Sequence, residues 1–188
     1  MPGKVFLRGE RVTLRTVESE DEDIDLLQQA RNDPDLREGL LFRSPSTRGQ
    51  VEEFIEEPVE DNDDTALLFV CVDEEPVGTV TLFDVHRENA TLAYWLLPEF
   101  HGEGYATEAV ALVIDHAFDT LGLNHLVAWT IDYNEDSQAL LGRLGFSHEG
   151  TYREHVFRKG EHHDTEHYGI LADEWVGSET ILDEQSSS

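Results

Sequence analysis

Residues 94–109 read YWLLPEFHGEGYATEA, and their character changes halfway along. The apolar and aromatic start favours a buried strand, whereas the alanine-rich end begins the spacing of an amphipathic helix. Gly102 and Gly104 stand between the two, where glycine lets the backbone approach a ligand closely. The first turn of a helix has free N–H groups, which attract anions. The stretch therefore predicts a phosphate or pyrophosphate site formed by the backbone of about residues 102–107.

Other phosphate-binding loops fit the same residues less well. A dinucleotide-binding fingerprint needs a third glycine where Thr107 stands, and it follows an early strand rather than one in mid-chain. A P-loop is excluded, because no Gly-Lys-Ser/Thr follows. A plain strand-to-helix turn, with glycines that serve packing alone, stays open as an alternative.

Strand and helix patterns extend from this stretch in both directions. Towards the N-terminus, they predict strands over residues 11–15, 65–72, 77–85 and 90–97, and helices over 20–30, capped by Ser19, and 47–57. Towards the C-terminus, they predict a helix over 103–121, a strand over 125–131, a helix over 136–144, and a hairpin of residues 146–157 and 165–171. This order implies an α/β fold with a mixed sheet. One domain is expected over residues 1–177, followed by a polar, frayed tail over 178–188.

The composition is strongly acidic, with 41 Asp and Glu against 13 Lys and Arg and a net charge of −28. Such a surface excludes binding to nucleic acid and to anionic membranes, which requires clustered cations. No apolar run reaches the roughly 20 residues of a membrane span, and no signal peptide is visible, so we expect a cytoplasmic protein. Because only Lys4 and Lys159 are lysines, the surface is typical of a halophilic protein. The alternative is an ordinary acidic protein.

Metal binding is not expected. The single cysteine, Cys71, lies in an apolar run and reads as a core thiol, so a cysteine cage is excluded. His162, His163 and His167 suggest a zinc site by composition. However, they follow a turn and enter a strand, where the spacing of i and i+4 does not bring two ligands together as a helix would.

Three motifs of this chain resemble those of GNAT acetyltransferases. Residues 101–106 match the pyrophosphate loop Arg/Gln-x-x-Gly-x-Gly/Ala, except that His101 stands at the first position. Asn134-Glu135-Asp136-Ser137 followed by Leu144-Gly145-Phe146, and then residues 149–153, are similar to the RimJ/RimL branch of that superfamily. The resemblance covers about residues 5–176, and it implies a protein that uses acetyl-CoA and no metal. The GNAT fold that it implies is a central, mostly antiparallel, twisted sheet of about six or seven strands with about four flanking helices, splayed at the cofactor site.

The resemblance also assigns roles to individual residues. The expected pyrophosphate-binding residues are His101, Gly102, Glu103, Gly104, Tyr105, Ala106 and Thr107. Asn134 is expected to bind the pantetheine arm, and Ser137 to donate a proton to the leaving thiolate; both could instead simply cap a helix. A backbone N–H at Leu96 or Leu97 is the expected donor to the oxyanion.

The general base is not evident from the sequence. Thr91 stands where the RimJ/RimL branch commonly has glutamate, and Glu88, His86 and Glu149 are the available substitutes, of which Glu88 is taken as the candidate. A base acting through water, or none, is also compatible with an α-amine, because a pKa near 8 leaves about a tenth of it neutral at pH 7.

The expected function is transfer of an acetyl group to a primary amine by direct attack in a ternary complex. A protein N-terminal α-amine of the ribosomal type is the acceptor that the RimJ/RimL resemblance implies, and a small-molecule amine is the alternative. A non-catalytic module that binds acyl-CoA is the second class of function. The resemblance alone suggests a homodimer.

Overall fold

The computed structural model describes residues 3–40, 42, 44–59 and 65–186. Within them one eight-stranded sheet has the order β1-β2-β3-β4-β5-β6-β8-β7. The strands are β1 (Val5–Arg8), β2 (Thr13–Thr16), β3 (Ala66–Val72), β4 (Glu75–His86), β5 (Asn89–Leu96), β6 (His125–Ile131), β7 (Ser147–Arg158) and β8 (Glu161–Leu171). All neighbours pair antiparallel except β5 and β6, which are parallel. The predicted mixed, mostly antiparallel sheet is confirmed, with eight strands rather than six or seven.

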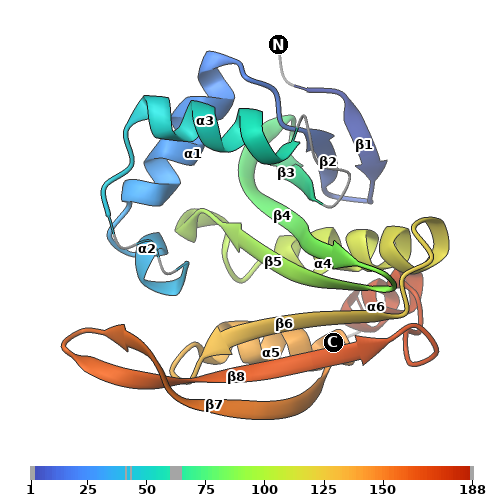
Figure 1. Cartoon of the computed structure of the whole chain (residues 1–188). Coiled ribbons are helices and arrows are strands. Elements are labelled where there is room, and N and C mark those ends of the chain that lie inside the picture. The colour runs from blue at the N-terminus through green and yellow to red at the C-terminus, as the bar shows by residue number, and fades with distance from the viewer. Residues whose placement is uncertain (1–2, 41, 43, 60–64, 187–188) are drawn as a thin grey trace.

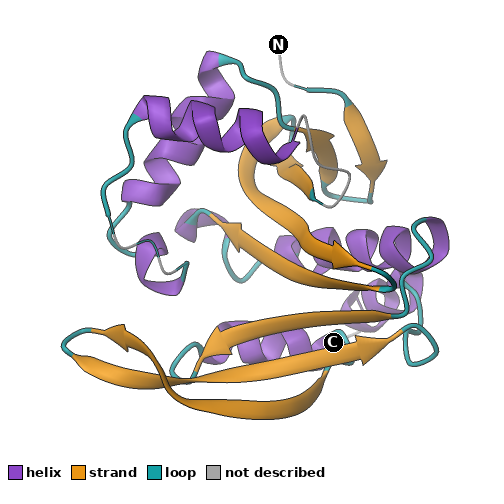
Figure 2. Ribbon diagram, viewed as in Figure 1, coloured by secondary structure: helices purple, strands orange, loops and turns teal. Residues whose placement is uncertain are grey.

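Helices cover both faces of the sheet (Figure 1, Figure 2). They are α1 (Asp21–Asn32), α2 (Leu36–Gly39), α3 (Arg48–Val59), α4 (Tyr105–Asp115), α5 (Glu135–Arg143) and α6 (Ser178–Ser186). Strand β3 shows how alternation builds two cores: Phe69 and Cys71 join the cluster of α1 and α3, whereas Leu68 and Val70 join that of α4 and α5. Cys71 is therefore the buried core thiol that its apolar context predicts.

The sheet opens between its two parallel strands. β5 and β6 are paired only through Asn89 with His125, Ala90 with Leu126 and Thr91 with Val127. Beyond these three pairs the strands separate, while β4 stays paired with β5 and β8 stays paired with β6. The predicted splay is thus present, and among the described residues no strand pairs with the far half of β5 on the side of β6.

Several predicted boundaries differ from the observed ones. Glu20, not Ser19, precedes α1, and it makes no side-chain cap. One helix was predicted over residues 103–121. Its α-helical part, α4, ends at Asp115, and the chain continues as a π-helical turn over His116–Thr120. Strand β1 was not predicted, because its four residues are largely exposed and show no alternation. No helix in the described segments has the length and apolar character needed to cross a membrane.

Residues 178–186 form helix α6, not the frayed tail that the polar composition of residues 178–188 suggested; the last two residues lie outside the described ones. The reason is a tertiary contact. Asp115 of α4 accepts hydrogen bonds from Nε1 of Trp175 (2.7 Å) and from the backbone N–H of Ser178 (3.2 Å), and Ile181 is buried in the main core. A single carboxylate thus orders a segment whose local sequence carries no strong helical signal.

Candidate active site

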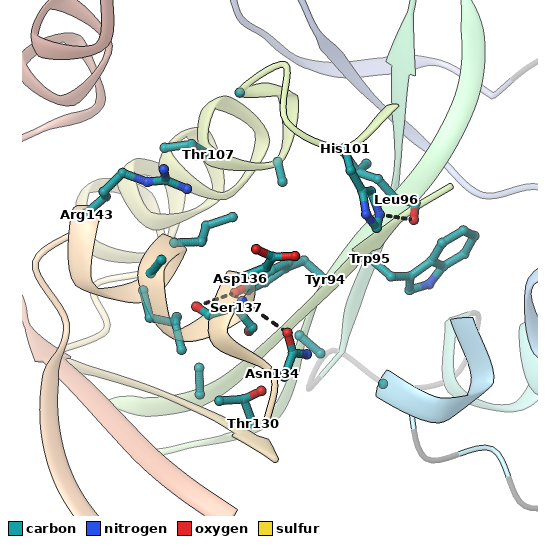
Figure 3. A pocket seen from close by; sticks show the side chains of 18 of the residues that line it. Tyr94, Trp95, Leu96, His101, Thr107, Thr130, Asn134, Asp136, Ser137 and Arg143 are labelled. Carbon is teal, nitrogen blue, oxygen red and sulfur yellow. Dashed lines mark hydrogen bonds between the residues drawn. The ribbon is translucent and has the colours of Figure 1, made fainter. Parts of the chain in front are cut away.

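A cavity of about 1580 Å³ occupies the gap between β5 and β6. Its wall includes ten of the residues discussed below, from β5, α4, α5 with its N-cap, and the loop before α4: Leu96, His101, Gly102, Glu103, Gly104, Ala106, Thr107, Asn134, Ser137 and Tyr94. Two predicted cofactor-binding residues, Leu97 and Tyr105, are not part of the wall. Figure 3 shows Thr107 and Arg143 on one side of the cavity and Trp95 on the other, with Tyr94 and Ser137 between them.

The loop before α4 has the geometry of an anion site. Gly102 and Gly104 have φ of 81° and 84°, in the left-handed region that favours glycine. Gly104 occupies the N-cap position of α4 without a side-chain cap, and the carbonyl of Gly104 accepts from the N–H of Glu108. The N–H groups of residues 105–107 precede that first helical bond, so they are the free donors of the first turn. They offer an anion the positive end of α4.

The end of β5 supplies a further donor. The N–H of Leu97 donates to the carbonyl of Val77 at 2.8 Å, so it is already used in pairing with β4. In an antiparallel pair successive residues alternate their hydrogen-bonding side, and the N–H and carbonyl of Leu96 therefore point away from β4. The Leu96 carbonyl indeed accepts from Nε2 of His101 at 2.9 Å on that side, if the ring carries its proton there. Of the two predicted oxyanion donors, only Leu96 has its N–H directed into the splay.

Helix α5 begins with a hydrogen-bonded pair of the predicted residues. Asn134 is the N-cap, and its Oδ1 accepts from the backbone N–H of Ser137 at 3.2 Å. The cap explains the Asn-x-x-Ser spacing, but it leaves the Ser137 hydroxyl uncommitted. That hydroxyl lies 2.8 Å from the hydroxyl of Tyr94, across the gap on β5 (Figure 3). Burial raises the pKa of Tyr94 to about 12, so its phenol is protonated at neutral pH and can donate to Ser137.

Tyr94 and Arg143 are cavity residues that the sequence reasoning did not assign. Tyr94 stood within the quoted motif, but nothing local indicated that its hydroxyl would meet Ser137, 43 residues away. Arg143 lies in the last turn of α5, and its guanidinium is directed into the cavity (Figure 3). Its charge also favours the ionised form of Tyr94, an effect smaller than that of burial. A basic residue just before Leu-Gly-Phe was the only available signal.

The candidate bases do not lie at this cavity. Glu88 sits in the turn before β5, at the opposite end of that strand from Leu96, and its carbonyl accepts from the N–H of His125. Glu149 pairs with the His125 side chain at 3.2 Å, at the same closed end of the splay. His86 pairs with Asn89 there. The structure therefore separates Glu88 from the residues predicted to act with it.

The C-terminal histidines have partners other than a metal. His163 lies 3.2 Å from a carboxylate oxygen of Asp132, and His167 stacks on Tyr152 with ring centroids 3.9 Å apart. In the described parts of the chain, no group of three or more His, Cys, Asp or Glu side chains has an arrangement that could hold a metal ion.

Comparison with known proteins gives the family. The model of the acetyltransferase (GNAT) domain matches residues 11–147. The SPbeta prophage-derived uncharacterized N-acetyltransferase YokL of Bacillus subtilis is 29% identical over 172 residues, which cover 90% of this chain and 95% of that protein.

Solved structures agree in fold. A spermidine N-acetyltransferase from Vibrio cholerae in complex with CoA and spermine has a TM-score of 0.81 at 21% identity, covering 90% of this chain and all (100%) of that one. RimL, a ribosomal α-N-protein acetyltransferase in complex with coenzyme A, has a TM-score of 0.80 at 17% identity, covering 89% and 98%. With the domain model matched over most of its length, the chain belongs to the GNAT family of N-acetyltransferases.

Proposed function

We propose that this enzyme transfers the acetyl group of acetyl-CoA to a primary amine, with a protein N-terminal α-amine as the first acceptor to test. One observation carries the proposal: three features that such a reaction needs lie along one cavity. They are the free first turn of α4, the Leu96 N–H and the Ser137–Tyr94 hydroxyl pair. A module that only binds acyl-CoA would need the first of these, but not a hydroxyl pair at the start of α5.

Each feature has a role in the proposed reaction. The N–H groups of residues 105–107 bind the pyrophosphate of acetyl-CoA, and Asn134 binds its pantetheine arm. The Leu96 N–H stabilises the negative charge that develops on the acetyl oxygen when the amine attacks. When the C–S bond breaks, its electron pair stays on sulfur and the thiolate takes a proton from Ser137, which recovers one from solvent water. His101 stands where the family has Arg or Gln. Its ring is hydrogen-bonded to the Leu96 carbonyl, so we do not assign it to a phosphate.

An α-amine suits a site whose candidate base lies elsewhere. Glu88, at the closed end of the splay, is no longer proposed as the base. A lysine side chain with a pKa near 10.4 is neutral in well under 0.1% of copies at pH 7, whereas about a tenth of an α-amine is neutral. A neutral α-amine can attack directly and lose its proton to water afterwards.

The function is tested by release of free thiol from acetyl-CoA, with mass spectrometry of the acceptor. The panel contains N-terminal peptides of ribosomal proteins, the same peptides with blocked α-amines, and small amines. Thiol release that requires a free α-amine and yields an acceptor heavier by one acetyl group supports the proposal. Tight binding of acetyl-CoA without acetylation of any acceptor would favour the binding module instead.

Arg143 is expected to contribute to acetyl-CoA binding. The other arginine of the cavity wall, Arg11, is held by Glu108 and by the Glu103 carbonyl, whereas the Arg143 guanidinium is directed into the cavity (Figure 3). In a chain with 41 acidic residues, a cation facing a phosphate-binding cavity should attract the anionic ligand. Arg143→Gln is expected to raise the Kd of acetyl-CoA about fivefold, a modest effect because the side chain is exposed.

Calorimetry with acetyl-CoA and with S-acetylpantetheine, which has no phosphate, checks the role of Arg143. Arg143→Gln should leave the affinity for S-acetylpantetheine unchanged. Arg153 is an exposed arginine on β7 outside the cavity, and Arg153→Gln should change the affinity for neither ligand. An equal loss for both ligands would contradict a phosphate contact.

We also propose that the acidic surface is a halophilic adaptation. The Debye length falls from about 10 Å at 0.1 M salt to about 3 Å at 1 M, so concentrated salt screens repulsion among the 41 acids. The temperature of thermal unfolding should rise continuously from about 0.1 M to about 2 M KCl. Circular dichroism measures it, and an unfolding temperature that does not depend on salt would identify an ordinary acidic protein.

A further inference from the structure

An aromatic cluster lies on the open face of the C-terminal half of the sheet. It consists of Trp129 on β6, His167 on β8, and Tyr152 and His155 on β7. Trp129 and His167 are direct partners across β6 and β8, and their rings are nearly parallel, with centroids 6.2 Å apart. Tyr152 stacks on His167 at 3.9 Å, and His155 lies 5.4–6.3 Å from the other three rings.

The cluster faces away from the core of this half-sheet. Ala128 and Tyr168, the neighbours of Trp129 and His167 along their strands, point to the opposite face and pack in the main core. Trp129 and Tyr152 are 38% and 56% exposed. Exposed contiguous aromatic surface on a chain this acidic is a feature of binding sites rather than of solvated faces.

The rings are held in place by a buried hydroxyl. Thr165, which is 0% exposed, has its Oγ1 2.8 Å from Nδ1 of His155 and 3.0 Å from Nε2 of His167. Burial is the main cause that lowers the pKa of His167, and it favours the neutral form of this ring. The cluster is therefore an aromatic surface whose rings are held in a fixed orientation.

The cluster is continuous with the reaction cavity through one residue. Trp129 belongs to the cavity wall, and so do Trp95 and Tyr133. Thr130, the next residue after Trp129, lies beside Asn134 and away from Thr107 (Figure 3). Because the phosphates of acetyl-CoA would be held near Thr107, and the adenine with them, the aromatic end remains for the acceptor.

We infer that the acceptor carries an aromatic group close to its primary amine, and that this group packs on Trp129 and the cluster behind it. The inference rests on the proposed function, since it concerns the second substrate of that reaction. The acceptor is therefore an aromatic amine or a peptide that begins with an aromatic residue.

The test compares two amines with the same number of carbons and the same ethylamine chain, 2-phenylethylamine and 2-cyclohexylethylamine. Their Kd values are measured by calorimetry on the protein saturated with coenzyme A, so that no turnover is needed. The aromatic amine should bind roughly three- to tenfold more tightly, the range expected for one aromatic pair beyond its area. Trp129→Leu should abolish that ratio and Trp129→Phe should retain part of it. Phe157→Leu, an aromatic residue 52% exposed on the same hairpin that contacts His162 instead, should leave it unchanged.

Four results would overturn the inference. They are equal affinities for the two amines, tighter binding of spermidine than of either, a weaker affinity for coenzyme A in Trp129→Leu, and a dimer by light scattering that Trp129→Leu dissociates. The last would show that a second copy covers the cluster. Failure of the proposed function differs from all of these, because it would leave an aromatic preference in binding but no acetylated product.

Discussion

Replacing Ser137 by alanine is expected to lower kcat by about 100-fold, with little change in the KM for acetyl-CoA. The hydroxyl is the proton donor to the leaving thiolate in the proposed reaction, and it acts only as the C–S bond breaks. The cap of α5 uses the backbone N–H of Ser137 and the side chain of Asn134, so alanine preserves the helix start. Steady-state kinetics of thiol release, with circular dichroism to confirm the fold, measure the effect.

The Tyr94→Phe variant tests whether the Tyr94 hydroxyl contributes to catalysis through Ser137 or only to the structure. The Tyr94 phenol lies 2.8 Å from the Ser137 hydroxyl, and by donating to it leaves the Ser137 proton free to point at sulfur. Tyr94→Phe should therefore lower kcat about tenfold in the wild type, but cause no further loss in Ser137→Ala. Tyr168→Phe, which changes a partly buried tyrosine packed against the core and outside the cavity wall, is the matched control.

The pH profile provides an independent check on this pair. Because the pKa of Tyr94 is raised to about 12, its phenol stays protonated across the working range, and kcat should show no loss from its ionisation below about pH 11. Losses that simply add in the double variant, or a rise in KM alone, would contradict the positioning of Ser137 by Tyr94.

The largest stability effect is expected from Asp23→Ala, which should lower the free energy of unfolding by about 3–5 kcal/mol. Asp23 on α1 and Arg15 on β2 are only 2% and 3% exposed, and Nη2 of Arg15 lies 2.7 Å from Oδ1 of Asp23. Removing the carboxylate leaves a buried guanidinium without its counter-ion. It also removes the acceptor for the Glu18 N–H, which lies 2.9 Å from Oδ2.

Urea denaturation at fixed high salt measures the loss of stability. Asp25→Ala is the matched control, because Asp25 lies on the same helix and pairs with Arg48 at 2.7 Å, but its side chain is 66% exposed. Exposed pairs contribute little, so this variant should unfold close to wild type. Arg15→Met combined with Asp23→Leu should recover most of the stability, since an apolar pair carries no desolvation cost. Equal effects of Asp23→Ala and Asp25→Ala would contradict the importance of burial.

The elements that the sequence predicted well are those determined by local pattern. β6 was placed at its observed bounds, and the glycine loop before α4 has the left-handed backbone that its residues suggested. These features depend on alternation and on glycine, both of which are visible within a few residues.

The features that could not be predicted depend on contacts between distant residues. The hydroxyl pair of Tyr94 and Ser137 arises only when β5 and α5 face each other across the splay. The start of helix α6 is hydrogen-bonded to Asp115 of α4. Glu88 lies away from the cavity because it precedes β5, whose other end reaches the cavity. The direction of the Leu96 N–H depends on the register in which β5 pairs with β4. That register cannot be read from either segment alone.

Only three residue pairs join β5 to β6, so the sheet consists of two halves that are hydrogen-bonded to each other over a short stretch. An extended ligand arm placed beside β5 would take the position of the strand that is missing there, and would connect the halves along the rest of their length. Substrate binding and global stability are then thermodynamically linked. At a ligand concentration of 100 times its Kd, the linkage amounts to about 2.7 kcal/mol. For a chain that repels itself as strongly as this one, its own substrate would be a folding partner as well as a reactant.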